Sequence, residues 1–112
     1  MIYVSFYGNV KNIDKNLEFY SISVGNGGYN FKKIKSFVPN WNLVQKFKSD
    51  NNWNYYVKEF NKQLEVLDKK VVYDWFKERD CVLLCYEKDN KFCHRKLVME
   101  YLKSLGLDCK EY

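Results

Sequence analysis

The chain is poor in several features that mark particular classes of protein. It has one proline and one histidine, and no apolar run approaches the roughly 20 residues that a membrane-spanning helix needs. It also lacks a basic segment followed by an apolar stretch near residue 1, so we expect no secretory signal, no membrane contact and a cytoplasmic location. Because the 112 residues contain no internal repeat and no low-complexity tail, we expect a single domain over residues 1–112.

Long blocks of like charge are also absent. The net charge is +5, but the basic residues are spread along the chain among acidic ones, which is weak support for a nucleic-acid groove. Aromatic residues make up 19% of the chain, and rings interleaved with basic side chains can stack on single-stranded nucleic acid. The alternative function is therefore a nucleic-acid-binding module, or an interaction protein of the phage or mobile-element type, that acts through a basic, aromatic-rich surface.

The four cysteines do not form a disulfide pattern. Cys81 and Cys85 lie in one short apolar run, and a chain without a secretory signal is expected in a reducing compartment, so we expect reduced thiols. Cys85, Cys93 and His94 could ligate zinc, but structural zinc sites favour ligand pairs two to four residues apart and neighbouring residues seldom face one ion. We predict no metal and no cofactor.

Hydrophobic periodicity predicts alternating strands and helices. Apolar side chains alternate over residues 2–7 and 18–24, two strands that end at Gly8-Asn9 and at the glycine-rich segment 25–28. The run 81–85 is typical of a buried parallel strand, and residues 107–112 form a candidate final strand. Helical spacing of apolar residues begins at Trp53 and continues for about four turns. Asp68 is a candidate N-cap for a short helix over residues 71–76.

The remaining segments complete the predicted fold. Pro39 predicts loop and short helical turns over residues 29–49. Apolar residues at helical spacing from Leu97 to Leu105 predict a last helix, which Gly106 ends. We therefore predict an α/β fold: a small, three- to four-stranded, mainly parallel sheet flanked by helices, Rossmann-like, in two or three layers.

In an open parallel sheet, ligands bind beyond the carboxyl ends of the strands. Three loops should meet there: one at Gly8 and Asn9, one after the second strand, and one from Glu87 to Cys93. In the second loop Ser23, Gly25 and Asn26 are candidate ligand contacts, although Gly-Asn-Gly-Gly is neither a Walker nor a dinucleotide motif and a plain turn is the commoner explanation. Candidate stacking surfaces are Tyr7, Tyr20, Tyr29 and Trp41, although aromatic residues at these spacings more often fill a core.

The stretch from Cys85 to Arg95, which contains the third loop, is the most informative part of the chain. Cys93 is predicted at the start of a helix, where the positive end of the helix dipole and the neighbours His94 and Arg95 would lower its pKa. Cys93 is therefore a candidate nucleophile, with Glu87 as a candidate proton acceptor. The alternatives for Cys93 are a ligand contact or a structural role, and Cys85 is expected to be an inert buried thiol.

His94 and Arg95 support a second hypothesis for the same loop. Helix N-termini present unpaired amide donors and an arginine adds a bidentate fork, a combination that binds anions. The expected partner is a nucleotide-like or other anionic small molecule. The competing interpretation is a buried Glu87–Arg95 ion pair that only holds the loop on the helix.

The same residues carry a resemblance to a known family. Val82-Leu-Leu-Cys-Tyr-Glu-Lys, followed by Phe92-Cys-His-Arg and an amphipathic helix, resembles the signature of the domain-of-unknown-function family 488, and the upstream spacing is similar to its shorter, phage-like branch. The family has no settled activity. The resemblance implies an α/β sheet and a shared site at Glu87, Cys93, His94 and Arg95. Many members carry arginine and proline after the second strand, where this chain has Asn26-Gly27-Gly28.

Overall fold

A computed structural model describes residues 1–86 and 93–112. The strands of this part are β1 (Ile2–Phe6), β2 (Glu18–Ser21), β3 (Lys32–Lys33), β4 (Cys81–Cys85) and β5 (Cys109–Glu111). The α-helices are α1 (Trp41–Asp50), α2 (Trp53–Glu65), α3 (Lys69–Phe76) and α4 (His94–Ser104), and the short 3-10 helices are η1 (Tyr7–Asn12) and η2 (Lys35–Phe37). No helix in these two ranges is long and apolar enough to cross a membrane.

The strands form one parallel sheet in the order β3-β2-β4-β1-β5. In the centre, β4 pairs with β1 and β2, and all five of its residues are buried. This position explains its continuous apolar sequence, because a central strand between two covered faces meets no solvent. The predicted α/β fold with a parallel sheet is confirmed, and the two-residue β3 adds a fifth strand.

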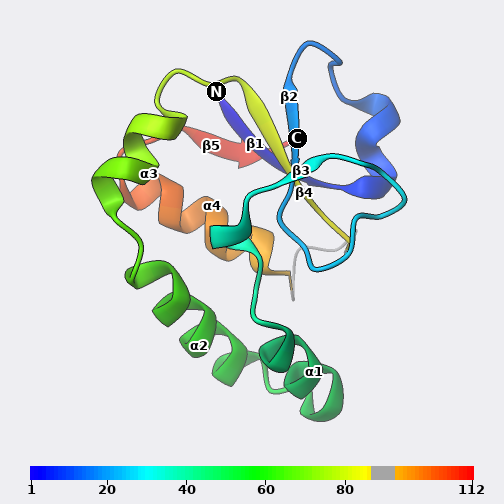
Figure 1. Cartoon of the computed structure of the whole chain (residues 1–112), viewed down its shortest axis with the longest axis vertical. Coiled ribbons are helices and arrows are strands. Elements are labelled where there is room, and N and C mark those ends of the chain that lie inside the picture. Colours follow the sequence, from blue (N-terminus) through cyan, green and yellow to red (C-terminus); the bar gives the residue numbers. More distant parts are fainter. Residues whose placement is uncertain (87–92) are drawn as a thin grey trace.

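Helices cover one face of the sheet (Figure 1). The larger core lies between them and the strands, where Val4 and Leu83 pack with Phe60 of α2 and Leu102 of α4. Side chains on a strand alternate between faces, so Ile2 joins Val4 in this core and the odd-numbered residues of β4 enter it as well.

A thinner layer covers the opposite face. Val82 and Leu84 of β4 pack there with Tyr7 of η1 and with Ile13, and the rings of Tyr29 and Phe31 complete this smaller cluster. The cover consists of η1 and loop segments, so the fold has one full helical layer and one partial layer.

The segment around α1 differs from the sequence expectation. Loop and short turns were expected over residues 29–49, but α1 is a ten-residue helix that begins two residues after Pro39 and ends before Asn51 in the left-handed region. The expectation was wrong because Pro39 precedes the helix, where its missing N–H costs no helical hydrogen bond. Helices α1 and α2 form a hairpin that projects from the sheet (Figure 1).

Local signals set several other boundaries. The Asp68 carboxylate accepts hydrogen bonds from the backbone N–H groups of Lys70 at 3.0 Å and Val71 at 3.2 Å, so the predicted N-cap of α3 is confirmed. Gly106, with a φ of 90°, follows the last turn of α4 and fits the predicted helix stop. Strand β2 ends at Ser21, earlier than the expected Val24, although the Ile22 N–H still donates to the Leu84 carbonyl at 2.9 Å.

Candidate functional site at the carboxyl ends of the strands

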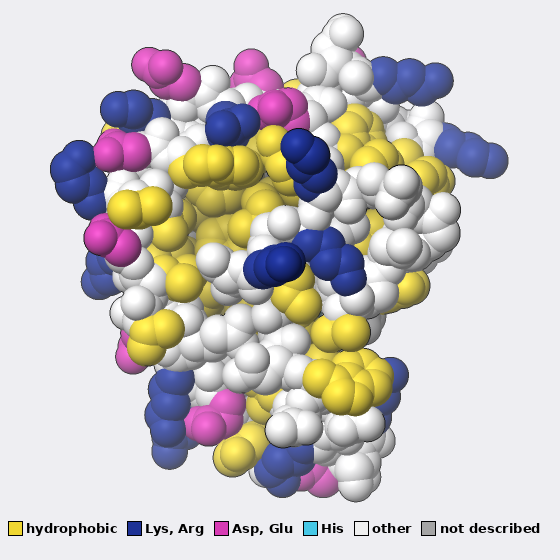
Figure 2. Space-filling view, in the orientation of Figure 1, with side chains coloured by type: hydrophobic (Ala, Val, Ile, Leu, Met, Phe, Trp, Pro, Cys, Tyr) yellow, Lys and Arg dark blue, Asp and Glu magenta, His cyan; other side chains and the backbone are white. Residues whose placement is uncertain are grey.

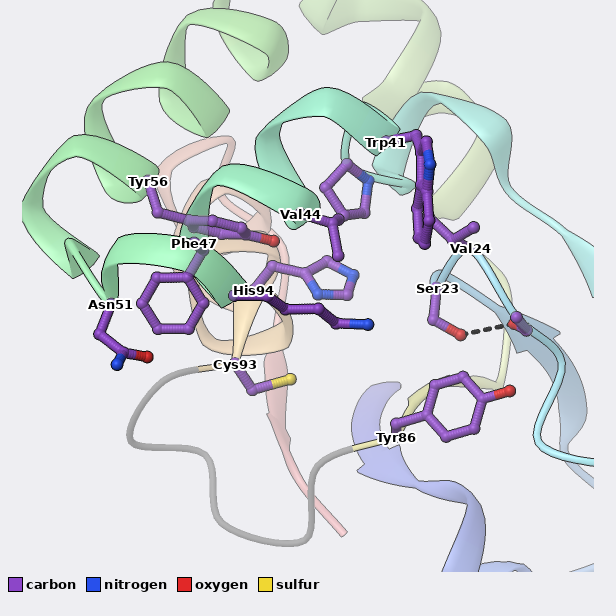
Figure 3. Close-up of a pocket in the computed structure, with 13 residues that line it drawn as sticks. Ser23, Val24, Trp41, Val44, Phe47, Asn51, Tyr56, Tyr86, Cys93 and His94 are labelled. Carbon is purple, nitrogen blue, oxygen red and sulfur yellow. Dashed lines mark hydrogen bonds between the residues drawn. The ribbon is translucent and has the colours of Figure 1, made fainter.

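A pocket of about 740 Å³ opens between the sheet and the α1–α2 hairpin. Its sheet side lies at the carboxyl ends of β2 and β4, as the parallel topology requires. Figure 3 shows Cys93 and His94 between Phe47 on the hairpin side and Ser23 and Tyr86 on the sheet side. The lining residues are Ser23, Val24, Gly25, Pro39, Trp41, Val44, Phe47, Lys48, Asn51, Tyr56, Tyr86, Cys93 and His94.

Flat side chains form much of the pocket wall. Trp41 and Phe47 come from α1, Tyr56 from α2, and Tyr86 directly follows β4. The rings of Phe47 and Tyr56 pack with their centroids 5.5 Å apart, while Trp41 is 49% exposed at the mouth. Apolar walls with aromatic faces suit a planar organic ligand.

A few polar groups stand at the edges of these rings. The Nζ atom of Lys48 lies 5.6 Å from the centre of the Trp41 ring and is a cation in the pocket wall. The Ser23 hydroxyl donates to the Gly25 carbonyl at 2.7 Å, and Asn51 contributes an amide. A planar ligand with a negative group would meet both the rings and a positive charge.

The loop after β2 approaches Tyr86 closely. A Cβ atom on Gly25 would lie 2.2 Å from the Tyr86 hydroxyl oxygen, a distance at which atoms overlap. The Gly27 N–H donates to the same oxygen at 3.0 Å. A side chain at position 25 would therefore displace the ring of Tyr86, whose hydroxyl holds the loop against the end of β4.

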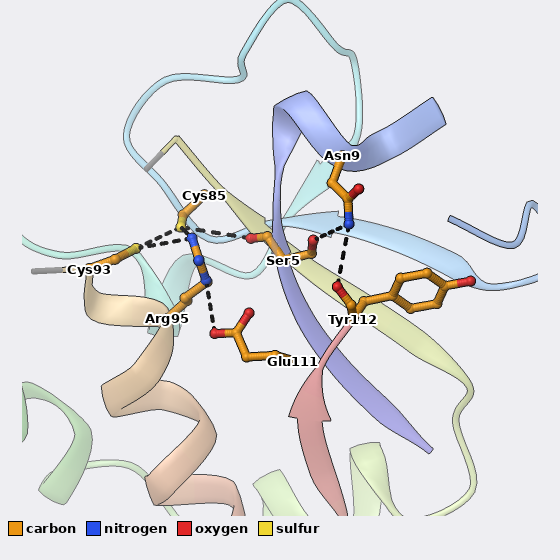
Figure 4. Close-up of polar contacts among 7 residues, drawn as sticks. All are labelled: Ser5, Asn9, Cys85, Cys93, Arg95, Glu111 and Tyr112. Atoms are coloured by element: carbon orange, nitrogen blue, oxygen red, sulfur yellow. Dashed lines mark hydrogen bonds and ion pairs between the residues drawn. The ribbon is translucent and has the colours of Figure 1, made fainter. Parts of the chain in front are cut away.

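Two thiols meet at the base of the pocket. Cys85 is the last residue of β4 and Cys93 is the N-cap residue of α4, and their Sγ atoms are 2.7 Å apart (Figure 4). Both side chains are buried, and all four cysteines carry reduced thiols. Of the two, Cys93 lines the pocket.

Arg95 lies behind this pair of sulfurs. Its Nη1 atom donates to Cys85 Sγ at 3.2 Å and lies 3.9 Å from Cys93 Sγ, and its Nε atom donates to Glu111 Oε1 at 3.1 Å (Figure 4). Burial alone lowers the pKa of Arg95, but the hydrogen bond to Cys85 and the attraction of both sulfurs and Glu111 outweigh it, so the pKa is raised. A guanidinium that is 2% exposed thus faces two sulfurs, and its charge favours a thiolate there.

His94 contacts the residue that follows β2 and a ring of α2. Its Nε2 atom is hydrogen bonded to the backbone carbonyl of Ile22, and its ring meets the Phe60 ring edge-on with centroids 5.4 Å apart. Because a carbonyl only accepts, this contact places a proton on Nε2. His94 therefore ties the start of α4 to the end of β2.

The cysteines at the other end of the sheet have a different environment. Cys81 opens β4 and Cys109 opens β5, and both are buried. Burial raises the pKa of each thiol to about 12, so both stay protonated at neutral pH. In the described part of the chain, no group of three or more His, Cys, Asp or Glu side chains is placed to hold a metal ion.

The structure brings together some of the residues that were proposed from sequence. Ser23, Gly25, Cys93 and His94 all line the pocket, whereas Arg95 is not among the described lining residues. The proposed base, Glu87, and with it the Glu87–Arg95 pair, lies outside the described residues.

Other candidates lie apart from the pocket. Asn9 donates to Ser5 Oγ at 3.2 Å and to the Tyr112 carbonyl at 3.4 Å, and its neighbour Gly8 shares η1 with it. The Asn26 side chain accepts from the Gly28 N–H within its own turn at 3.1 Å. None of Gly8, Asn9 and Asn26 belongs to the described pocket lining.

Sequence reasoning missed most of the α1 wall. Val44, Phe47, Lys48 and Asn51 line the pocket, but the segment was expected to lack a helix. The available signal was the apolar spacing of Leu43, Val44 and Phe47 after Pro39, which fits one face of a helix.

The fold and the site define a small parallel α/β domain with a two-thiol pocket at its strand ends. Residues 19–106 match the family model DUF488-N3a, described as the active DUF488-N3 subclade, and the chain belongs to this family. The match confirms the resemblance to family 488 and includes β2, β4, the α1–α2 hairpin and α4. No curated protein and no solved structure matched the chain.

Proposed function

We propose that this domain binds a planar, anionic small molecule of the nucleotide type in the pocket and that the Cys93 sulfur then bonds to an electrophilic carbon or phosphorus of that molecule, while the leaving group on the same atom departs with the bonding electrons. The observation that carries the proposal is the position of Cys93, which lines a ring-walled pocket while its sulfur contacts Cys85 in front of Arg95. A thiolate is the reactive form of cysteine, and a nearby guanidinium stabilises it.

Each part of the pocket has a role in this proposal. Trp41 and Tyr86 stack on the planar part of the ligand, and Lys48 pairs with its negative group. Arg95 acts on the ligand only through the sulfurs, so we assign it a positioning role. Glu87 remains our candidate proton acceptor. The description of the matched subclade as active supports an enzyme and names no reaction.

Binding is tested by isothermal titration of the whole chain with AMP, GMP, CMP and UMP, each tried separately. We expect at least one of them to bind, and Lys48→Ala to weaken that binding at least tenfold. Lys11→Ala is the matched control, because Lys11 is an exposed lysine on η1 and does not line the pocket. Binding that is equally strong in both variants, or no binding at millimolar concentration, would refute the proposed ligand class.

Catalysis is tested separately from binding with Cys93→Ser. We expect this variant to bind the same nucleotide with little change and to lose any turnover or covalent adduct, because a serine hydroxyl at this position is a much weaker nucleophile. Cys109→Ser is the matched control at the far end of the sheet. If turnover survives in Cys93→Ser, Cys93 is not the nucleophile.

A specific observation favours the alternative of a nucleic-acid-binding surface. Lys46 lies 4.7 Å from the centre of the exposed Tyr55 ring, and Lys48 lies near the exposed Trp41 ring. On the side of the molecule that Figure 2 views, lysine and arginine side chains lie among exposed hydrophobic ones. A single-stranded oligonucleotide that binds where mononucleotides do not, with affinity that falls steeply with salt, would support this alternative.

The expected cytoplasmic location belongs to the same proposal. A cytoplasmic location would keep the four cysteines, which the structure does not join in disulfides, in the thiol form. Chemistry at an unmodified Cys93 requires such conditions.

A further inference from the structure

We propose that Cys85 and Cys93 form a two-thiol redox site, in which a hydroperoxide oxidises Cys93 and Cys85 then closes a reversible disulfide. This reaction does not depend on the nucleotide-type ligand. Disulfide formation would be either a second reaction at the pocket or a reversible inactivation of the Cys93 nucleophile.

The first argument is the contact between the sulfurs. The two Sγ atoms lie 2.7 Å apart, so a bond between them needs almost no movement of the backbone. The residues belong to different elements, since Cys85 ends β4 and Cys93 precedes α4. A disulfide would therefore join the central strand to the last helix across the floor of the pocket.

The other two cysteines provide an internal comparison. Cys81 and Cys109 both pair with Ile2 of β1, one on each side of it. Neighbouring strands lie about 4.8 Å apart, so the two Cα atoms are separated by about 9 to 10 Å. Disulfides need Cα atoms within about 7 Å. The sheet thus keeps one pair of thiols apart and brings the other pair together.

The second argument is the charge beside the sulfurs. Arg95 Nη1 reaches Cys85 Sγ at 3.2 Å and Cys93 Sγ at 3.9 Å, while Arg95 Nε is held by Glu111. Peroxides react with thiolates, and a fixed guanidinium stabilises both the thiolate and the developing negative charge of the departing oxygen. Arg95 is a positioning residue in this reaction.

The third argument is access, which distinguishes the two thiols. Cys93 lines the pocket, whereas Cys85 is not among the described residues that line it. A small peroxide in the pocket therefore meets Cys93 first. This order makes Cys93 the oxidised thiol and Cys85 the resolving thiol.

The chemistry balances in two steps. The Cys93 thiolate attacks one peroxide oxygen, the O–O bond breaks, and the other oxygen leaves with the bonding electrons and takes a proton as an alcohol or water. Cys93 is then a sulfenic acid. The Cys85 sulfur attacks the Cys93 sulfur, the S–S bond forms, the S–O bond breaks, and the hydroxide leaves with the Cys85 proton as water. Two thiols lose two electrons to the peroxide, and a dithiol reductant returns them by exchange.

The test treats the reduced whole chain with hydrogen peroxide and follows intact mass and peptides. We expect a loss of two hydrogen masses, a Cys85–Cys93 linked peptide, and full reversal by dithiothreitol. In Cys85→Ser we expect a Cys93 sulfenic acid that dimedone traps, and in Cys93→Ser neither product. Cys81→Ser and Cys109→Ser are the matched controls and should form the same linkage as the unmodified sequence.

Several results would overturn the proposal. They are a dimedone adduct at Cys93 that persists while Cys85 is present, a linkage that involves Cys81 or Cys109 to the same extent, or disulfides only between molecules. Should serine at position 85 impair folding, Cys85→Ala provides the same readout with an apolar side chain. Nucleotide titration under reducing conditions reports only on the proposed function, so failure of one proposal does not entail failure of the other.

Discussion

Strand β4 has a cysteine at each end, and the two ends differ in their chemistry. At the amino end, Cys81 is buried, and this burial raises its pKa to about 12 against the opposing charges of the amino terminus and Arg79. At the carboxyl end, Cys85 is equally buried but contacts another sulfur and the Arg95 guanidinium. Burial by itself makes a thiol inert, whereas burial beside a fixed cation can make it reactive. Position along the strand decides between the two outcomes.

The largest expected difference between the two ends is in thiol reactivity. At pH 7.5 a thiol with a pKa of about 12 is ionised in only about one molecule in 30,000, whereas an ordinary thiol is about one-tenth ionised. We therefore expect iodoacetamide to modify Cys93 at least about a thousandfold faster than Cys81 or Cys109.

Time-resolved alkylation of the native protein, read by peptide mass spectrometry, measures the four rates in one sample. Alkylation in denaturant is the control, because all four thiols should then react at similar rates. If Cys93 reacts as slowly as Cys81 in the native protein, the two ends of the strand do not differ in the way proposed.

A smaller difference is expected in the stability provided by the arginines near the two ends of β4, Arg95 and Arg79. Arg95→Ala removes a buried cation from Glu111 and two sulfurs, so we expect a loss of about 3 kcal/mol in the free energy of unfolding. Arg79→Ala removes an ion pair to Glu18 whose side chains are 34% and 49% exposed. We expect about 1 kcal/mol or less for this change.

Urea unfolding of both variants provides the measurement. Arg95→Lys is an informative third variant, because it keeps the charge and loses the forked geometry that reaches Glu111 and Cys85 together. Equal losses of unfolding free energy for Arg95→Ala and Arg79→Ala would show that the buried Arg95 stabilises the fold no more than the exposed Arg79 does.

The smallest expected effect is a gradual loss of unfolding free energy in alkaline solution. This loss reports on the thiols at the amino end of the sheet. The folded pKa values of Cys81 and Cys109, about 12, lie above the value of about 8.5 for an exposed thiol. Their contribution to stability is full below pH 8.5 and is lost as the pH rises toward 12, because the unfolded chain releases these protons first. The slope is about 1.4 kcal/mol per pH unit for each thiol.

Unfolding free energies measured from pH 8 to pH 11 would check this slope. We expect Cys81→Ala and Cys109→Ala each to make the alkaline decline shallower, and the double variant to do so by about the sum of the two changes. An unchanged slope in the double variant would mean that these thiols ionise as easily in the folded state as in the unfolded state.

Local patterns were enough to predict most of the fold. The alternation in β1, the apolar run of β4 and the Asp68 cap are each visible within a few consecutive residues of the sequence, and the structure contains all three. Helix α1 was missed because one proline was given more weight than the apolar spacing after it. Strand β3 has only two residues, too few to show any periodicity.

The candidate site was harder to predict, because its geometry is not local. His94 and Arg95 both follow Cys93, but successive residues on a helix point about 100° apart. As a result His94 lines the pocket and Arg95 faces Glu111. Glu111 lies on β5, 16 positions after Arg95, and no spacing rule connects them. The contact between Cys85 and Cys93 likewise depends on how α4 packs at the end of β4.

Two separate parts of the chain form the pocket, and the α1–α2 hairpin is one of them. The hairpin provides Trp41, Phe47 and Tyr56, while the sulfurs come from residues after position 80. Most of the ring wall is therefore separate in sequence from the sulfurs, although Tyr86 completes that wall next to them. Substitutions at Trp41 and Phe47 would change the shape of the pocket and leave the contacts between the two sulfurs in place.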